Sequence, residues 1–234
     1  MLSAQHVGIA ANLQRVREQI GEACLRAGRR AEEVTLVGVS KTHSPEAVAA
    51  AVQAGLRDLG ENRVQEAAPK IPAVRQLVAE QPTWHLVGHL QTNKVNASLE
   101  LFDAIDSVDS LHLAEALSKR LKGRGLPVLL EVYVGDDPNR PGFRPPELKD
   151  AVGRILELPG LEVQGLMTVA PLGEDPRPAF AQARELSSQL AQSYPRVHLR
   201  VLSMGMSDDF AAAILEGSTQ VRIGTAIFGP RRTA

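Results

Sequence analysis

The N-terminal part of the chain carries apolar side chains at helical spacing. Ile9, Leu13, Val16, Ile20 and Leu25 are separated by polar positions that include arginines and glutamates. A helix with 3.6 residues per turn collects these apolar side chains on one face. The spacing predicts an amphipathic helix over residues 4–28.

From residue 34 onward the pattern changes. Short aliphatic and β-branched runs alternate with longer stretches that are rich in Ala, Leu and Glu. This alternation is typical of repeated βα units that build a parallel sheet. The runs predict eight strands, over residues 35–40, 57–60, 84–88, 104–108, 128–134, 163–169, 197–203 and 220–224.

The stretches between the strands predict crossover helices. Ser44 before Pro45 is a helix-start signal, and so is Ser207 before the acidic pair Asp208 and Asp209. Together with the leading helix, the elements predict an α/β fold, a single (β/α)8 TIM-type barrel. An open doubly wound sheet is the alternative, but no Gly-x-Gly-x-x-Gly follows the first strand. The helices are predicted over residues 45–54, 64–80, 93–99, 111–122, 146–157, 178–193 and 208–216.

The composition is consistent with this fold and limits the possible domain number, partners and location. The chain has 234 residues, a net charge of −1 and 44% hydrophobic residues, so one domain over residues 1–234 is expected. Basic residues do not concentrate on any predicted helix, which argues against nucleic acid as a partner. Polar residues interrupt the N-terminal stretch, so neither a signal peptide nor a membrane span is expected, and a cytoplasmic location follows. Cys24 alone excludes an internal disulfide.

In this architecture the active or binding site lies where the strands end, and phosphate is often held by the loops after the seventh and eighth strands. Lys41 follows the first strand, where an apolar run leads into an amine at the barrel mouth. Desolvation there disfavours the charged amine and frees it to attack a carbonyl. The alternative is a lysine whose head reaches solvent at the strand end.

Two later segments favour an anion near that amine. Residues 203–207 and 224–225 supply glycines, hydroxyls and backbone N–H groups beside predicted helix starts. A phosphorylated carbonyl compound is therefore a candidate ligand, although tight turns and a helix cap explain the same residues. Arg222 stands inside an apolar run and needs an acceptor, either a pyridine nitrogen or a buried carboxylate.

Seven motifs, in this order along the chain, resemble those of the pyridoxal phosphate homeostasis proteins, whose barrel is similar to the N-terminal domain of bacterial alanine racemase. The resemblance covers most of the chain. The motifs are VGVSK at 37–41, LGEN at 59–62, VQE at 64–66, WHLVGHLQTNK at 84–94, GLMT at 165–168, LSMGMSDD at 202–209 and VRIGTAIFG at 221–229.

The resemblance implies pyridoxal 5′-phosphate (PLP) as the cofactor, held as a Schiff base on Lys41. It implies that Arg222 faces the pyridine nitrogen. By the same resemblance Ser207, Gly224 and Thr225 hold the phosphate, while Asn62, Met167 and Met206 line the ring pocket.

Three positions depart from the family pattern and concern the rim of the pocket. Arg63 stands where the family commonly has an aromatic residue, and Tyr133 replaces a frequent Asn. Residues 136–143, from Asp136 to Phe143, are an altered form of a Gly-rich loop that contains Lys.

These features predict a reversible PLP carrier or reservoir rather than a catalyst. An Arg beside the pyridine nitrogen disfavours its protonation and weakens carbanion stabilisation. A racemase also needs a second acid/base, which in the racemase family is a tyrosine from another domain of a partner subunit; Tyr133 and Tyr194 are the only tyrosines here. The lack of that domain favours a monomer, and PLP-dependent apoenzymes are the expected recipients.

Other functions remain as alternatives. A racemase-like enzyme or a class I aldolase acting on a phosphosugar through Lys41 would share the barrel and the phosphate loop. A serine hydrolase based on Ser207 lacks the Gly that its elbow requires, since residue 209 is Asp. His85 and His89 have no convincing third metal ligand, so hydrogen bonding is their expected role and no metal site is predicted. A protein-interaction scaffold would leave Lys41 and Arg222 unexplained.

Overall fold

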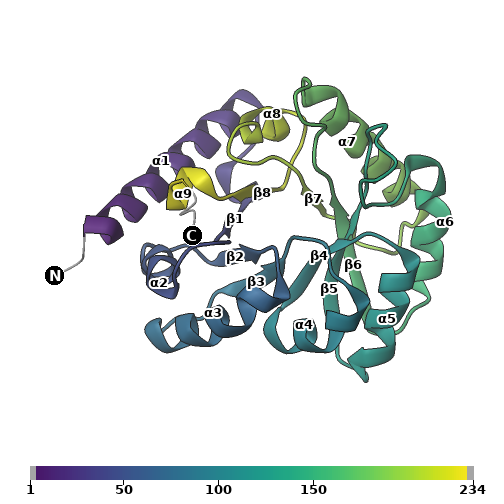
Figure 1. Cartoon of the computed structure of the whole chain (residues 1–234). Helices are drawn as coiled ribbons and strands as arrows, with labels where there is room; N and C mark the ends of the chain where they lie inside the picture. The colour runs from purple at the N-terminus through teal and green to yellow at the C-terminus, as the bar shows by residue number, and fades with distance from the viewer. Residues whose placement is uncertain (1–3, 231–234) are drawn as a thin grey trace.

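The structure is a computed structural model that describes residues 4–230, with side chains from residue 8 onward. Eight strands form a closed barrel in which sequence neighbours pair in parallel and the first strand pairs with the last (Figure 1). The predicted TIM-type architecture is therefore confirmed. The strands are β1 (Thr35–Val39), β2 (Asp58–Glu61), β3 (Thr83–Leu86), β4 (Ala104–Val108), β5 (Leu126–Glu131), β6 (Leu161–Met167), β7 (Val201–Ser203) and β8 (Gln220–Ile223).

Helices surround the barrel and bury their apolar faces against it (Figure 1). Trp84, Phe102 and Phe180 are among the largest fully buried side chains of this layer. No helix within residues 4–230 has the length and apolar character needed to cross a membrane. The helices are α1 (Ala4–Arg26), α2 (Pro45–Gln53), α3 (Val64–Leu77), α4 (Val95–Leu101), α5 (Leu111–Leu121), α6 (Pro145–Leu156), α7 (Arg177–Ser193), α8 (Phe210–Leu215) and α9 (Thr225–Phe228), with short 3-10 helices at Ala31–Glu33 and Thr92–Lys94.

Helix α1 packs across α2, α8 and α9 and covers the seam where β1 meets β8 (Figure 1). The side-chain amide of Asn12 donates to the carbonyl oxygen of Ile227, 3.0 Å away. Four of the five predicted apolar positions are buried, but Leu25 is 80% exposed because Cys24 takes the buried position in the last turn. The helix also ends two residues earlier than predicted, at Arg26.

Strands β5 and β7 differ most from their predicted extents, because local hydrogen bonds replace ladder bonds, whereas the ends of the other strands agree with the prediction within two residues. In the predicted strand 197–203, the N–H of Leu199 bonds to Val197 and that of Arg200 to His198, so β7 begins only at Val201. Strand β5 stops at Glu131 instead of residue 134. The N–H of Val132 still donates to the carbonyl of Met167 in β6, but the N–H of Tyr133 donates to the carbonyl of Phe143 instead.

The β1–β8 seam fixes the position of the predicted site. Gly38 of β1 is paired with Ile223 of β8, so the segments that follow these strands begin side by side. Ser44 caps α2 as predicted, because its hydroxyl accepts from the N–H of Ala47. The loop from β1 into α2 is thereby held at both ends.

Candidate functional site

The predicted site residues lie at the end of the barrel where all eight parallel strands finish. Lys41 follows β1, Asn62 follows β2 and Met167 is the last residue of β6. The remaining ones are Met206 and Ser207 between β7 and α8, Arg222 within β8, and Gly224 and Thr225 at the start of α9.

The loop that carries Lys41 contacts the segment that begins α9. The ring of His43 stacks on the ring of Phe228, with centroids 5.1 Å apart and planes at 29°. A Cβ atom added at Gly224 would lie 3.2 Å from the carbonyl oxygen of Val39, so a side chain there would crowd the end of β1. The half-buried Lys41 and the predicted phosphate-binding segment are therefore neighbours.

Ser207 makes a contact that was not predicted from the local sequence. Helix α8 begins at Phe210 with Asp209 at its N-cap, so the expected helix start at Asp208 after Ser207 is wrong. The Ser207 hydroxyl accepts instead from the N–H of Ala226, in the first turn of α9, at 3.4 Å. The hydroxyl of one loop thus meets the backbone N–H groups of the other.

Gly205 fixes the shape of the loop that carries Met206 and Ser207. Its φ of +95° lies in the left-handed region, and a Cβ atom there would lie 2.6 Å from the Cβ of Ala213. Its carbonyl accepts from the N–H of Arg222 at 3.0 Å. The loop is therefore packed on α8 and tied to β8, which leaves Met206 42% exposed.

Asn62 and Met167 have different surroundings. A Cβ atom at Gly88 would lie 2.4 Å from the carbonyl oxygen of Asn62, so only glycine allows the loops after β2 and β3 to approach so closely. Met167 is buried, with 1% of its surface exposed. The predicted ring-lining role of either residue stays a prediction.

The guanidinium of Arg222 lies inside the barrel and donates to neutral acceptors. It donates to the Ser203 hydroxyl at 2.8 Å and to the Thr168 carbonyl at 2.9 Å. Burial lowers the pKa of Arg222, while the charges of Asp106 and Glu131 act in the opposite direction. Among the described residues no carboxylate forms an ion pair with it, so the direct carboxylate partner considered from the sequence is absent.

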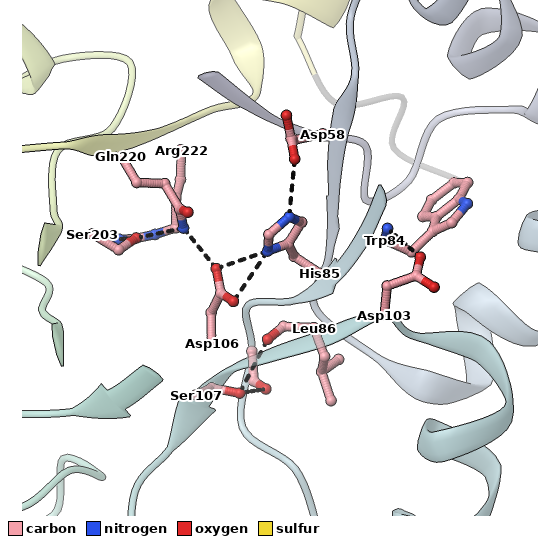
Figure 2. Close-up of polar contacts among 11 residues, drawn as sticks. Asp58, Trp84, His85, Leu86, Asp103, Asp106, Ser107, Ser203, Gln220 and Arg222 are labelled. Atoms are coloured by element: carbon pink, nitrogen blue, oxygen red, sulfur yellow. Dashed lines mark hydrogen bonds and ion pairs between the residues drawn. The ribbon is translucent and has the colours of Figure 1, made fainter. Parts of the chain in front are cut away.

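A chain of buried polar side chains continues from Ser203 across the barrel (Figure 2). The Gln220 amide donates to Ser203 at 3.0 Å and to Asp106 at 2.7 Å. His85 lies between Asp106, 3.1 Å from Nδ1, and Asp58, 3.3 Å from Nε2. Burial alone would lower the pKa of His85, but the two carboxylates outweigh it and raise the pKa to about 10. His85 is thus a charged hydrogen-bond donor in the barrel interior.

Glu131 is a titratable group at the mouth that the sequence did not single out. It ends β5, and burial together with the charge of Asp109 raises its pKa to about 7, against the opposing charges of Arg222, His89 and Arg140. Its position at a strand end, as the only acidic residue of an apolar run, was the available signal.

Replacing Glu131 with glutamine is expected to stabilise the protein at pH 8 by about 2 kcal/mol. The folded pKa of about 7 exceeds the ordinary 4.5, so the folded protein retains a proton that the unfolded chain releases between these values, and stability falls as pH rises through this range. Denaturant unfolding at pH 4 and pH 8 measures the difference. Glu100→Gln, at an exposed position of α4, is the control. An equal effect of Glu131→Gln at both pH values would contradict the assignment.

The three departures from the family pattern lie at the rim. Arg63 is exposed at the N-cap of α3 and lines a cavity of about 440 Å³ together with Lys94. Tyr133 is buried, and Arg140 and Arg144 lie 5.7 and 4.8 Å from its ring centroid. These contacts hold the altered loop 136–143 and the residue after it against the segment that follows β5, beside a second cavity of about 630 Å³.

The remaining candidate residues have structural partners. His89 contacts Asp109 at 2.5 Å, and within residues 8–230 no cluster of three or more His, Cys, Asp or Glu side chains could hold a metal ion. Tyr194 is the C-cap of α7, and its hydroxyl donates to the Lys149 carbonyl at 2.8 Å, away from the strand ends. His85 and His89 both make hydrogen bonds, which is the role expected for them from the sequence.

Known proteins place the chain in a family. The model of the family "Alanine racemase, N-terminal domain" matches residues 9–232. A protein of Aquifex aeolicus named pyridoxal phosphate homeostasis protein is 44% identical over 94% of this chain and 97% of its own length. The Escherichia coli K12 protein of the same name is 42% identical over 95% and 97%.

Solved structures agree with this placement. PipY of Synechococcus elongatus with PLP bound superposes with a TM-score of 0.82 at 38% identity, covering 94% of this chain and 100% of that one. An alanine racemase of Clostridium difficile, at 17% identity and a TM-score of 0.70, shares the fold over 97% of this chain and 57% of its own. The chain belongs to the pyridoxal phosphate homeostasis protein family, within the family of alanine racemase N-terminal domains.

Proposed function

We propose that this protein binds PLP reversibly and serves as a carrier or reservoir of the cofactor, with Lys41 as its covalent attachment point. The observation that carries the proposal is the contact between the Lys41 loop and the start of α9, through His43 on Phe228 and Gly224 against Val39. An amine and the predicted anion-binding segment thus lie at the same mouth. The PLP-bound relative at 38% identity supports the same ligand.

The residues present fit PLP chemically. The group supplies an aldehyde, which condenses reversibly with a primary amine and releases one water, and a phosphate. Ser207, Gly224 and Thr225 would hold the phosphate, because the Ser207 hydroxyl already meets the first turn of α9 and Gly224 leaves space beside β1. Asn62, Met167 and Met206 would surround the ring.

Arg222 explains why catalysis should be weak. Its guanidinium is fixed by Ser203 and Thr168 and stays charged, so a ring nitrogen facing it receives a hydrogen bond but resists protonation. Tyr133 is buried beside two arginines and Tyr194 lies elsewhere, which leaves no tyrosine in the position of a second acid/base. We therefore propose a non-catalytic role.

The proposal extends to the setting of the protein. PLP-dependent apoenzymes would receive the cofactor, in the cytoplasm, from a monomer in which residues 1–234 form one PLP-binding domain. Size-exclusion chromatography with light scattering measures the oligomeric state, and transfer of PLP to an added apoenzyme measures delivery.

Borohydride trapping tests ligand and attachment residue together. We expect the protein incubated with PLP to be yellow, to lose the visible band on reduction, and to yield one PLP-modified peptide containing Lys41. A colourless protein that instead traps a phosphosugar would favour the aldolase alternative. Turnover of an amino acid at enzymatic rates would overturn the non-catalytic role.

A further inference from the structure

A buried cluster of charged side chains lies directly behind Lys41. Lys70 of α3 contacts Glu61 of β2 at 2.8 Å and Glu66 of α3 at 2.7 Å. The side chains of Lys70 and Glu61 are 6% and 0% exposed, whereas that of Glu66 is 30% exposed. These three residues are separate from Arg222 and from the residues proposed to hold the phosphate.

The cluster binds the backbone on both sides of Lys41. Lys70 Nζ donates to the carbonyl oxygen of Ser40, 2.8 Å away, which belongs to the peptide bond before Lys41. The N–H of Thr42, in the peptide bond after Lys41, donates to the Glu66 carboxylate. The Ser40 hydroxyl donates to Glu61 at 2.6 Å. Both peptide groups that flank Lys41 are thus anchored to one ion-paired network.

The backbone held in this way is strained. Thr42 has a φ of +66°, in the left-handed region that β-branched residues rarely occupy. Such a conformation persists only where surrounding contacts hold it, and it occurs often at functional sites. The hydrogen bond from the Thr42 N–H to the Glu66 carboxylate is one such contact.

Stability alone does not explain the cluster. Burying the charges of Lys70 and Glu61 costs desolvation free energy, and apolar residues of similar volume often serve a core equally well. Oxygen Oε2 of Glu61 is buried without a hydrogen-bond partner among the described residues. A lysine side chain has many rotamers, so its amine is directed best when its own backbone is fixed.

We propose that Lys70, Glu61 and Glu66 are positioning residues that clamp the peptide groups around Lys41 and so direct its amine toward an incoming aldehyde. The inference rests on the proposed function in that Lys41 is the attachment point. In the step that the cluster serves, a C=N bond forms between the neutral Nζ and the aldehyde carbon, the aldehyde C=O bond breaks, and its oxygen leaves as water with the two amine protons.

The first experiment measures covalent attachment of PLP from the growth of the visible band. Lys70→Met is expected to slow attachment at least tenfold. Glu66→Ala should slow it more than Glu66→Gln, since glutamine keeps an acceptor for the Thr42 N–H. Lys119→Met, at an exposed site on α5, and Glu147→Gln, whose carboxylate accepts a backbone N–H on α6, are matched controls expected to stay within twofold.

A double-mutant comparison separates positioning from general damage. In a Lys41→Ala background, Lys70→Met is expected to leave the non-covalent affinity for PLP within twofold, because the cluster acts only through Lys41. If Lys70→Met lowered the affinity for PLP equally with and without Lys41, the proposal would be overturned. An attachment rate of Lys70→Met within twofold of the unmodified protein would also overturn it. If Lys70→Met does not fold, the partly exposed Glu66→Gln provides the same comparison.

A second measurement needs no cofactor and so separates failure of the clamp from failure of PLP binding. Hydrogen exchange followed by mass spectrometry is expected to show at least tenfold faster exchange in the peptide covering residues 40–44 of Glu66→Ala, with the β4 peptide unchanged. Unchanged exchange at 40–44 overturns the clamp even if PLP binds. Faster exchange in a protein that never binds PLP supports the clamp and refutes the proposed function alone.

Discussion

Lys41→Ala is expected to abolish the borohydride-stable attachment of PLP completely. Ser207, Gly224 and Thr225 would still hold the phosphate, so a weaker, non-covalent complex should remain. Each tenfold loss in affinity corresponds to about 1.4 kcal/mol. Absorbance titration measures the affinity, and intact-mass analysis after reduction measures the attachment.

Two further variants make this result specific. Lys41→Arg retains the positive charge but cannot supply a neutral amine, so it should also fail to attach PLP. Lys149→Ala, at an exposed position of α6, should behave like the unmodified protein. A modified lysine elsewhere in Lys41→Ala, at the original rate, would show that the attachment point is assigned wrongly.

His85→Gln is expected to destabilise the folded protein by about 3 kcal/mol at pH 7, because it leaves the buried Asp106 without its charged partner. For a chain of this size the melting temperature should fall by about 10 °C. Thermal unfolding followed by circular dichroism measures the change. His112→Gln, at an exposed position on α5, is the control.

The effect should depend on pH in a definite direction. The pKa of His85 is raised from 6.5 to about 10 in the folded protein, so its stabilisation is fully present below pH 6.5 and is lost as pH rises through 10. The stability difference between the unmodified protein and His85→Gln should therefore shrink between pH 7 and pH 10. A constant difference over this range would mean that the imidazole is neutral in the fold.

The strand order and the end of the barrel that holds the site could be predicted because both follow from the alternation of apolar runs and helices. The residue at which β7 begins could not be predicted in this way. Residues 197–200 alternate like a strand, but Leu199 and Arg200 form bonds to residues two positions earlier, a choice of partner that alternation does not encode. The short α9 was missed because residues 225–228 are too few to show a helical period.

Among the candidate site residues, the sequence identified chain positions but not their partners. Ser207 precedes an acidic pair and therefore looks like a cap of α8, whereas its contact with Ala226 exists only once β8 is in place. Lys70 was not identified because a lysine in a helix is normally exposed. Its spacing of four from Glu66, near a strand that ends in Glu61, was the available signal.

The pairing of β1 with β8 has a consequence for how the protein is made. Lys41 is synthesised early, but Gly224 and Phe228, which lie against the end of β1 and the loop after it, emerge from the ribosome only after all eight strands have been synthesised. Contacts between such distant parts of a chain form late, since a long loop must close first. A nascent chain that lacks β8 should be unable to capture the cofactor, so occupancy of the site would report that synthesis has passed the closing strand.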